Sequence, residues 1–206
     1  MWSYQGRDAG ILLFDACFTA GAPMPFDPGA KVLEIGCDES DWLERAWTAW
    51  PDVAFSGIDT RPDKGQRPYR FARNAIDPSL FPPATFDAIV SLSAMEHMGL
   101  GHYGDPVDPD GDITVARNAW TWLKPGGWCY FDVPYDPTGY RIQGTKCRIY
   151  DDETLRARLV PAGARVAWMG FANASHPHLL LPRPASPVKP FHYVACVLQK
   201  SSPDRE

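Results

Sequence analysis

The sequence lacks the features of several protein classes. No apolar run reaches the ~18–20 residues of a membrane-spanning helix. The first residues, Met-Trp-Ser-Tyr-Gln-Gly-Arg-Asp, lack the basic and then apolar order of a secretory signal peptide. Lys and Arg total 20 against 25 Asp and Glu, so the net charge of −5 disfavours broad binding to nucleic acid or to anionic membranes.

The cysteines also lack the number and spacing of a paired or metal-binding set. The five thiols are an odd number, and no two have the C-x-x-C spacing of a zinc knuckle or a redox pair. This usage predicts neither a disulfide framework nor a metal site, and it favours a reducing compartment such as the cytoplasm.

What the sequence does have in excess is proline, at 21 of 206 residues, about twice the usual share. Proline interrupts helices and central strands, so the proline-free windows should mark the regular elements. Apolar spacing within those windows predicts helices over 7–20, 39–50, 112–123 and 151–160. It predicts strands over 31–35, 53–58, 69–73, 86–92, 128–133, 166–171 and 192–198.

Strands and helices thus alternate along the chain. Alternation predicts an α/β fold with a mostly parallel sheet of seven strands and helices on both faces. No helical pattern separates the last two strands, so we expect them to pair antiparallel at one edge. In open sheets of this kind, ligands bind beyond the carboxyl ends of the strands.

The residues at those ends form an ordered series. Val32-Leu33-Glu34-Ile35-Gly36-Cys37 ends the first strand, Asp59 ends the second, and Asp77 follows the third. The strand Phe86-Asp87-Ala88-Ile89-Val90 comes next, and the turn Leu123-Lys124-Pro125-Gly126-Gly127 follows the next helix. In this order the series resembles the class I S-adenosylmethionine-dependent methyltransferases over residues 31–133.

That resemblance implies a Rossmann-like fold and S-adenosylmethionine as cofactor. It places Asp59 on the ribose hydroxyls and Asp77 near the adenine, with the other cofactor contacts at Glu34, Gly36, Cys37, Asp38 and Ser91. The chain length and the lack of a visible domain boundary predict one domain over 1–206. It would have a leading helix and linker (1–28), a cofactor-binding core (31–133), substrate-side loops and edge strands (134–199) and a tail (200–206).

The chain departs from the pattern at two positions. Asp38 and Ser40 stand where the family's loop has its second and third glycines. Asp38 adds bulk and negative charge there, which either binds the amino group of the cofactor or weakens cofactor binding.

The loop after the fourth strand has a second resemblance. Residues 96–112 and 146–150 look like a little-characterised methyltransferase-like family that often accompanies sugar and polysaccharide biosynthesis. Within the loop, His97 is the candidate general base because its ordinary pKa of ~6.5 suits proton transfer near neutral pH. Glu96 is the second candidate, and the expected acceptor-site residues are His102, Tyr103, Asp105, Tyr135, Arg141 and Arg148.

Three further patterns have more than one interpretation each. The carboxylates Asp105, Asp108, Asp110 and Asp112 resemble part of a calcium loop but lack its closing Glu, so turns and a helix cap at Asp112 are favoured. The cations Arg61, Lys64, Arg67, Arg70 and Arg73 fit either a phosphate-bearing acceptor or a solvated loop. The proline-rich insert 175–190 fits a lid, a dimer contact, a partner-binding segment or a rigid surface loop.

Taken together, these patterns predict an S-adenosylmethionine-dependent methyltransferase acting on a small polar acceptor, for which a sugar or glycoside hydroxyl is one candidate. The alternatives are a nucleic-acid or nucleotide methyltransferase and a non-catalytic partner protein with the same fold.

Overall fold

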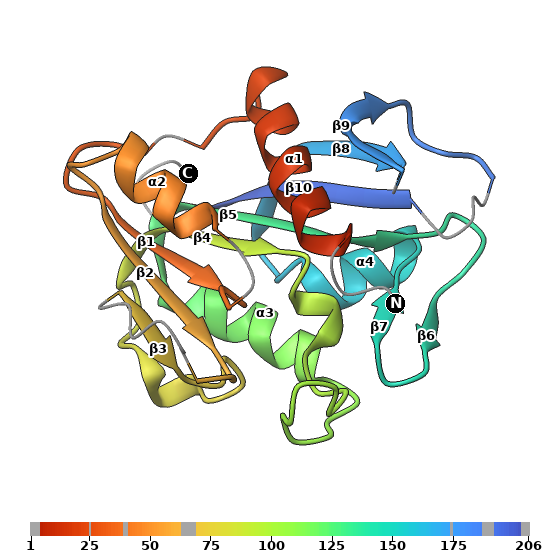
Figure 1. Cartoon of the computed structure of the whole chain (residues 1–206), viewed down its shortest axis with the longest axis horizontal. Coiled ribbons are helices and arrows are strands. Elements are labelled where there is room, and N and C mark those ends of the chain that lie inside the picture. The colour runs from red at the N-terminus through yellow and green to blue at the C-terminus, as the bar shows by residue number, and fades with distance from the viewer. Residues whose placement is uncertain are drawn as a thin grey trace.

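An eight-stranded sheet organises the computed structural model of the chain (Figure 1). The structure describes residues 5–24, 26–38, 41–62, 69–173, 175–186 and 192–202, without the side chains of 5–8. The strands lie in the order β3-β2-β1-β4-β5-β10-β8-β9. Their bounds are β1 (Lys31–Ile35), β2 (Ala54–Asp59), β3 (Arg70–Ala72), β4 (Phe86–Leu92), β5 (Leu123–Tyr135), β8 (Ala164–Asn173), β9 (His176–Leu181) and β10 (His192–Lys200).

The strand directions match the prediction. Strands β1 to β5 run parallel, so their carboxyl ends meet at one edge of the sheet. Strand β10 runs antiparallel to both of its neighbours, β5 and β8. The expected α/β architecture, with antiparallel strands at one side of a mostly parallel sheet, is confirmed.

Helices cover both faces of the sheet (Figure 1). Their bounds are α1 (Gln5–Thr19), α2 (Trp42–Ala49), α3 (Gly111–Trp122) and α4 (Asp152–Leu159), with short 3-10 helices η1 (Pro78–Leu80) and η2 (Met95–His97). Side chains alternate along each strand: Val32 packs in the core with α1 and α2, whereas Leu33 packs in the core with α3 and α4. Among the described residues, no helix is both long and apolar enough to cross a membrane.

Three local features differ from the sequence prediction. Strand β9 forms from the insert expected to be a loop, and it pairs antiparallel with β8 as the eighth strand of the sheet. A separate hairpin, β6 (Arg141–Gln143) and β7 (Cys147–Ile149), follows β5. The expected turn at 124–127 is a bulge within β5, opposite the single residue Asp87, because the partners of Phe86 and Ala88 are Leu123 and Trp128.

Candidate functional site

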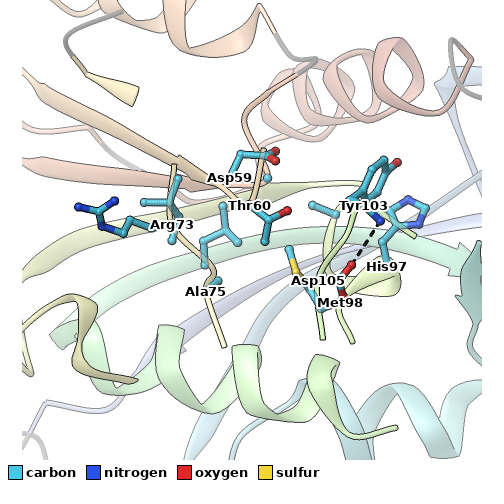
Figure 2. A pocket seen from close by; sticks show the side chains of 12 residues that line it. Asp59, Thr60, Arg73, Ala75, His97, Met98, Tyr103 and Asp105 are labelled. Carbon is cyan, nitrogen blue, oxygen red and sulfur yellow. Dashed lines mark hydrogen bonds between the residues drawn. The ribbon is translucent and has the colours of Figure 1, made fainter. Parts of the chain in front are cut away.

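A pocket opens where the carboxyl ends of β1 and β2 meet the segment after β4 (Figure 2). It encloses about 420 Å³ of empty space, part of it open solvent. The lining residues are Ile35, Gly36, Ile58, Asp59, Thr60, Arg73, Ala75, Ala94, His97, Met98, Tyr103 and Asp105. The pocket therefore lies at the edge of the sheet where the sequence predicted a ligand.

Gly36 forms the turn at the base of this pocket. Its φ of +83° lies in the left-handed region that favours glycine. A Cβ at this position would collide with the Cβ of Ala94. Its N–H donates to the carbonyl of Ile58 at 2.8 Å, which ties the end of β1 to the end of β2.

Asp59 ends β2 and is 8% exposed. Two backbone N–H groups orient its carboxylate: Arg61 N donates to Oδ1 and Asp38 N donates to Oδ2, each at 3.0 Å. The Arg61 guanidinium adds Nε to Oδ1 and Nη2 to Oδ2, both at 3.0 Å. Burial alone would raise the pKa of Asp59, but the hydrogen bonds and charge of Arg61, helped by the N–H of Asp38, lower it below its usual value.

Asp38 is held by two cations. Its carboxylate lies 3.4 Å from Nε of Arg61 and 3.2 Å from Nη2 of Arg70, whose side chain is only 2% exposed. The charge that Asp38 brings into the glycine loop is therefore balanced within the fold. Ser40 lies outside the described residues, as do Lys64 and Arg67 of the basic cluster.

The remaining predicted cofactor residues lie apart from the pocket surface. Asp77 is exposed and caps η1, accepting from the backbone N of Ser79 at 2.9 Å and from its hydroxyl at 2.7 Å. Glu34, Cys37 and Ser91 are buried beneath the surface. From the segment after β3, the structure brings Arg73 and Ala75 to the pocket instead of Asp77.

His97 and Glu96 lie in η2, and of the two only His97 belongs to the lining of this pocket. Glu96 is 2% exposed, and its Oε1 is 3.6 Å from Nε2 of His97. The Nδ1 of His97 is hydrogen-bonded to the carbonyl of Lys146, just before β7. A carbonyl only accepts, so Nδ1 carries the proton and Nε2 is the basic nitrogen of the neutral ring.

Three rings gather at the mouth of the pocket. The Tyr103 ring lies 5.4 Å from that of His97 and 4.7 Å from that of His102. Figure 2 shows the His97 and Tyr103 side chains beside each other. Asp105 supports this loop by accepting from the backbone N of Gly99 at 2.7 Å and of Tyr103 at 3.3 Å.

Arg148, expected to bind an acceptor, has a structural position instead. Its side chain is fully buried and donates to four backbone carbonyls of the loop after β4, those of Glu96, Met98, Asp108 and Pro109. Its Nε also lies 3.5 Å from Asp112. This arginine therefore holds the loop and presents no donor to the pocket.

Two other predicted acceptor residues also lie elsewhere. Tyr135 is buried, with its ring 5.1 Å from that of Phe171 in the core. Arg141 is on β6 and pairs with Asp136 at 2.6 Å. Tyr135 is the last residue of β5 and Arg141 comes after that strand, and neither belongs to the pocket lining.

The acidic run of the loop serves internal contacts. Asp112, expected to cap α3, accepts from the Tyr150 hydroxyl at 2.9 Å and from two nitrogens of Arg158 at 2.7 and 2.8 Å. Asp108 accepts from the N–H of Asp110 at 2.9 Å, as turn chemistry predicts. Within the described part of the chain, no group of three or more His, Cys, Asp or Glu could hold a metal ion.

One buried acid near the site was not predicted from the sequence as a site residue. Asp132 on β5 accepts from the Ser93 hydroxyl at 2.6 Å, and Ser93 has a φ of +46° directly before the pocket residue Ala94. Burial raises the pKa of Asp132 to about 7, and the Ser93 hydrogen bonds offset this only in part. The short polar sequence Ser91-Leu92-Ser93 at the end of a strand was the signal for this pair.

One family model and one curated protein match parts of the sequence. The family described as "Caenorhabditis protein of unknown function, DUF268" matches residues 79–168, less than half of the chain. Methyltransferase str3 of Strobilurus tenacellus is 28% identical over 116 residues, which are 54% of this chain and 38% of that protein. The match thus spans well under half of that relative.

Solved structures match nearly the whole chain. The 1,6-didemethyltoxoflavin-N1-methyltransferase of Burkholderia thailandensis, solved with its substrate and S-adenosylhomocysteine, is 17% identical with a TM-score of 0.63 over 98% of this chain and 80% of its own. The 4+2 cyclase SpnF is 13% identical with a TM-score of 0.64 over 94% and 82%. The second protein is described as a cyclase, so this fold alone does not determine the reaction, which depends on the residues of the site. The chain has the class I fold of the S-adenosylmethionine-dependent methyltransferases.

Proposed function

We propose that the protein transfers a methyl group from S-adenosylmethionine to a small polar acceptor. The observation that carries this proposal is the convergence of the Gly36 turn, the Asp59 carboxylate and His97 on one pocket. The fold, the methyltransferase relative and the bound S-adenosylhomocysteine of the Burkholderia enzyme support the same cofactor class.

The residues present fit this cofactor. At Gly36 the absent side chain lets the backbone approach a ligand closely, and Ala94 blocks any substitute. At Asp59 two backbone N–H groups fix the orientation of the carboxylate, whose pair of oxygens matches the spacing of a vicinal diol. Glu34, Cys37 and Ser91 are buried, Asp38 is paired with Arg61 and Arg70 within the loop, and Asp77 caps η1. When bound, S-adenosylmethionine supplies an electrophilic methyl group.

His97 is the general base in this proposal. The Lys146 carbonyl accepts a hydrogen bond from Nδ1, so Nε2 is the nitrogen that would take the proton of an acceptor hydroxyl. Glu96 lies 3.6 Å from that nitrogen and stabilises the imidazolium that forms. Catalysis otherwise depends on positioning, because methyl transfer needs an in-line nucleophile and little covalent help.

The acceptor is a small hydroxylated molecule, with a sugar or glycoside as the candidate we favour. The rings of His97, His102 and Tyr103 give the pocket mouth flat apolar faces with polar edges. Arg61, Arg70 and Arg148 make ion pairs with carboxylates of the fold, which disfavours the nucleic-acid alternative.

We propose the cytoplasm as location, since five buried free thiols suit a reducing compartment.

Calorimetric titration with S-adenosylhomocysteine tests the proposal. We expect binding by the wild type and a loss of at least about tenfold in affinity for Asp59→Ala, because two charge-assisted hydrogen bonds disappear. Asp52→Ala, at an exposed acid before β2, is the matched control and should bind as the wild type does. His97→Gln should also keep its affinity while losing turnover in a screen of hydroxylated acceptors.

Absence of binding by the folded wild type at millimolar ligand would refute the enzyme proposal. It would favour the alternative of a non-catalytic protein with this fold.

A further inference from the structure

The Asp59 carboxylate already has four hydrogen-bond donors. Each oxygen accepts one backbone N–H and one guanidinium N–H, all at 3.0 Å. A carboxylate has about four lone-pair sites, so these bonds fill its accepting capacity. A ligand hydroxyl can reach Asp59 only if one of the present donors leaves.

The two kinds of donor differ in how easily they leave. The N–H groups of Asp38 and Arg61 belong to the backbone at the ends of β1 and β2 and are fixed by the fold. The Arg61 guanidinium, in contrast, stands at the end of a flexible side chain that can change its rotamer while the backbone stays in place. Its two parallel N–H bonds engage one carboxylate bidentately, which is also how a vicinal diol would engage it.

The surroundings offer Arg61 other partners next to this position. The guanidinium carbon lies 4.3 Å from the centre of the Tyr103 ring, and Nε lies 3.4 Å from Asp38. Both Tyr103 and Asp38 can stabilise the Arg61 guanidinium after it has turned away from Asp59. Arg70 on β3 continues to balance Asp38, at 3.2 Å.

We propose that Arg61 is an internal competitor for the ribose site, occupying both oxygens of Asp59 until the diol of the cofactor displaces it onto Tyr103 and Asp38. This inference rests on the proposed function, since it assumes that a nucleoside diol binds Asp59. Arg61 then sets the affinity of the site, and cofactor release is coupled to the return of the guanidinium.

Titration of S-adenosylhomocysteine into Arg61 variants tests this competition. Arg61→Ala should bind about tenfold more tightly than the wild type, because displacing a bidentate charged pair no longer opposes binding. Arg61→Lys should fall between them, since an ammonium is a point charge without the bidentate fork. Arg45→Ala removes an arginine from an exposed ion pair with Asp15, at 3.4 Å, and should leave affinity unchanged.

The outcomes separate the two proposals. Equal or weaker binding by Arg61→Ala, with normal binding by the wild type, overturns the competition and leaves the cofactor site intact. No binding by any folded variant overturns both. If Arg61→Ala unfolds because Asp59 loses its cation, Arg61→Gln serves in its place, since it keeps most of the size without the charge.

Discussion

At the scale of single residues, the environment gives two acids of the site opposite properties. Asp59, at the end of β2, and Asp132, within β5, are both buried. Arg61 and two backbone N–H groups stabilise the Asp59 carboxylate and lower its pKa. Asp132 has the Ser93 hydroxyl as its hydrogen-bond donor, so burial dominates and raises its pKa to about 7. Asp59 thus stays charged in the physiological range, whereas Asp132 titrates there.

The raised pKa of Asp132 predicts a pH-dependent cost in stability. Its folded-state pKa of about 7 lies above the ordinary 3.8, so the folded state binds more protons between these values and stability falls as pH rises through that window. Asp132→Asn removes the titration. The free energy of unfolding of this variant, relative to that of the wild type, should therefore rise by roughly 2–4 kcal/mol as the pH increases from about 4 to about 8. Urea unfolding at several pH values measures this difference. A difference that is independent of pH would contradict the prediction.

At the scale of elements, Arg148 joins the loop after β4 to the β6–β7 hairpin. The loop carries His97, Met98, Tyr103 and Asp105, which form one wall of the pocket. Because the loop has little regular structure beyond η2, its carbonyls depend on this buried guanidinium for hydrogen bonds. Close backbone packing of Gly99 on Gly111, which a Cβ would prevent, adds to the restraint.

Replacing Arg148 should therefore affect the whole wall of the pocket. Arg148→Met removes one donor from each of four carbonyls and one of the two cations of Asp112. Arg158 still donates to the carbonyl of Pro109, and the N–H of Gly111 still donates to that of Asp108. We expect a loss of about 3 kcal/mol or more in the free energy of unfolding. Chemical denaturation measures it. Arg117→Met on the exposed face of α3 is the matched control and should change stability by less than about 0.5 kcal/mol. Similar values for the two variants would refute the role of Arg148.

At the scale of the molecule, the last strand completes the centre of the sheet. Strand β10 lies between β5 and β8 and is paired along nearly its whole length on both sides. Strand β3, in contrast, has three residues and pairs only with β2 at the edge of the sheet. Strand β10 is therefore part of the core, whereas β3, which leads to Arg73 and Ala75, lies at the periphery of the sheet.

Hydrogen exchange should reproduce this order. Amides of β4, β5 and β10 are expected to exchange only on global unfolding, and those of β3 and the β6–β7 hairpin much sooner, because local opening costs less at an edge. Residue-resolved exchange measured by NMR or mass spectrometry reports both groups together. Exchange in β10 as fast as in β3 would contradict this arrangement.

The sequence by itself determined the alternation of strands and helices and the residues at the strand ends. These features depend on local patterns: proline placement, apolar spacing, and the glycine and acids that follow β1 and β2. The pocket residues Gly36, Asp59, His97 and Tyr103 were identified in this way. The eighth strand and the hairpin were missed because their short, partly exposed segments lack a strong period.

Only the tertiary structure decided which charges meet. Arg61 and Arg70 looked like members of a solvated basic cluster, yet they converge on Asp38 and Asp59 from separate segments. Arg148 looked available to an acceptor, yet it is buried against carbonyls some 40 to 50 residues earlier in the chain. Residue type and local spacing carry no information about such partners, because the fold alone sets the distances on which hydrogen bonds and ion pairs depend.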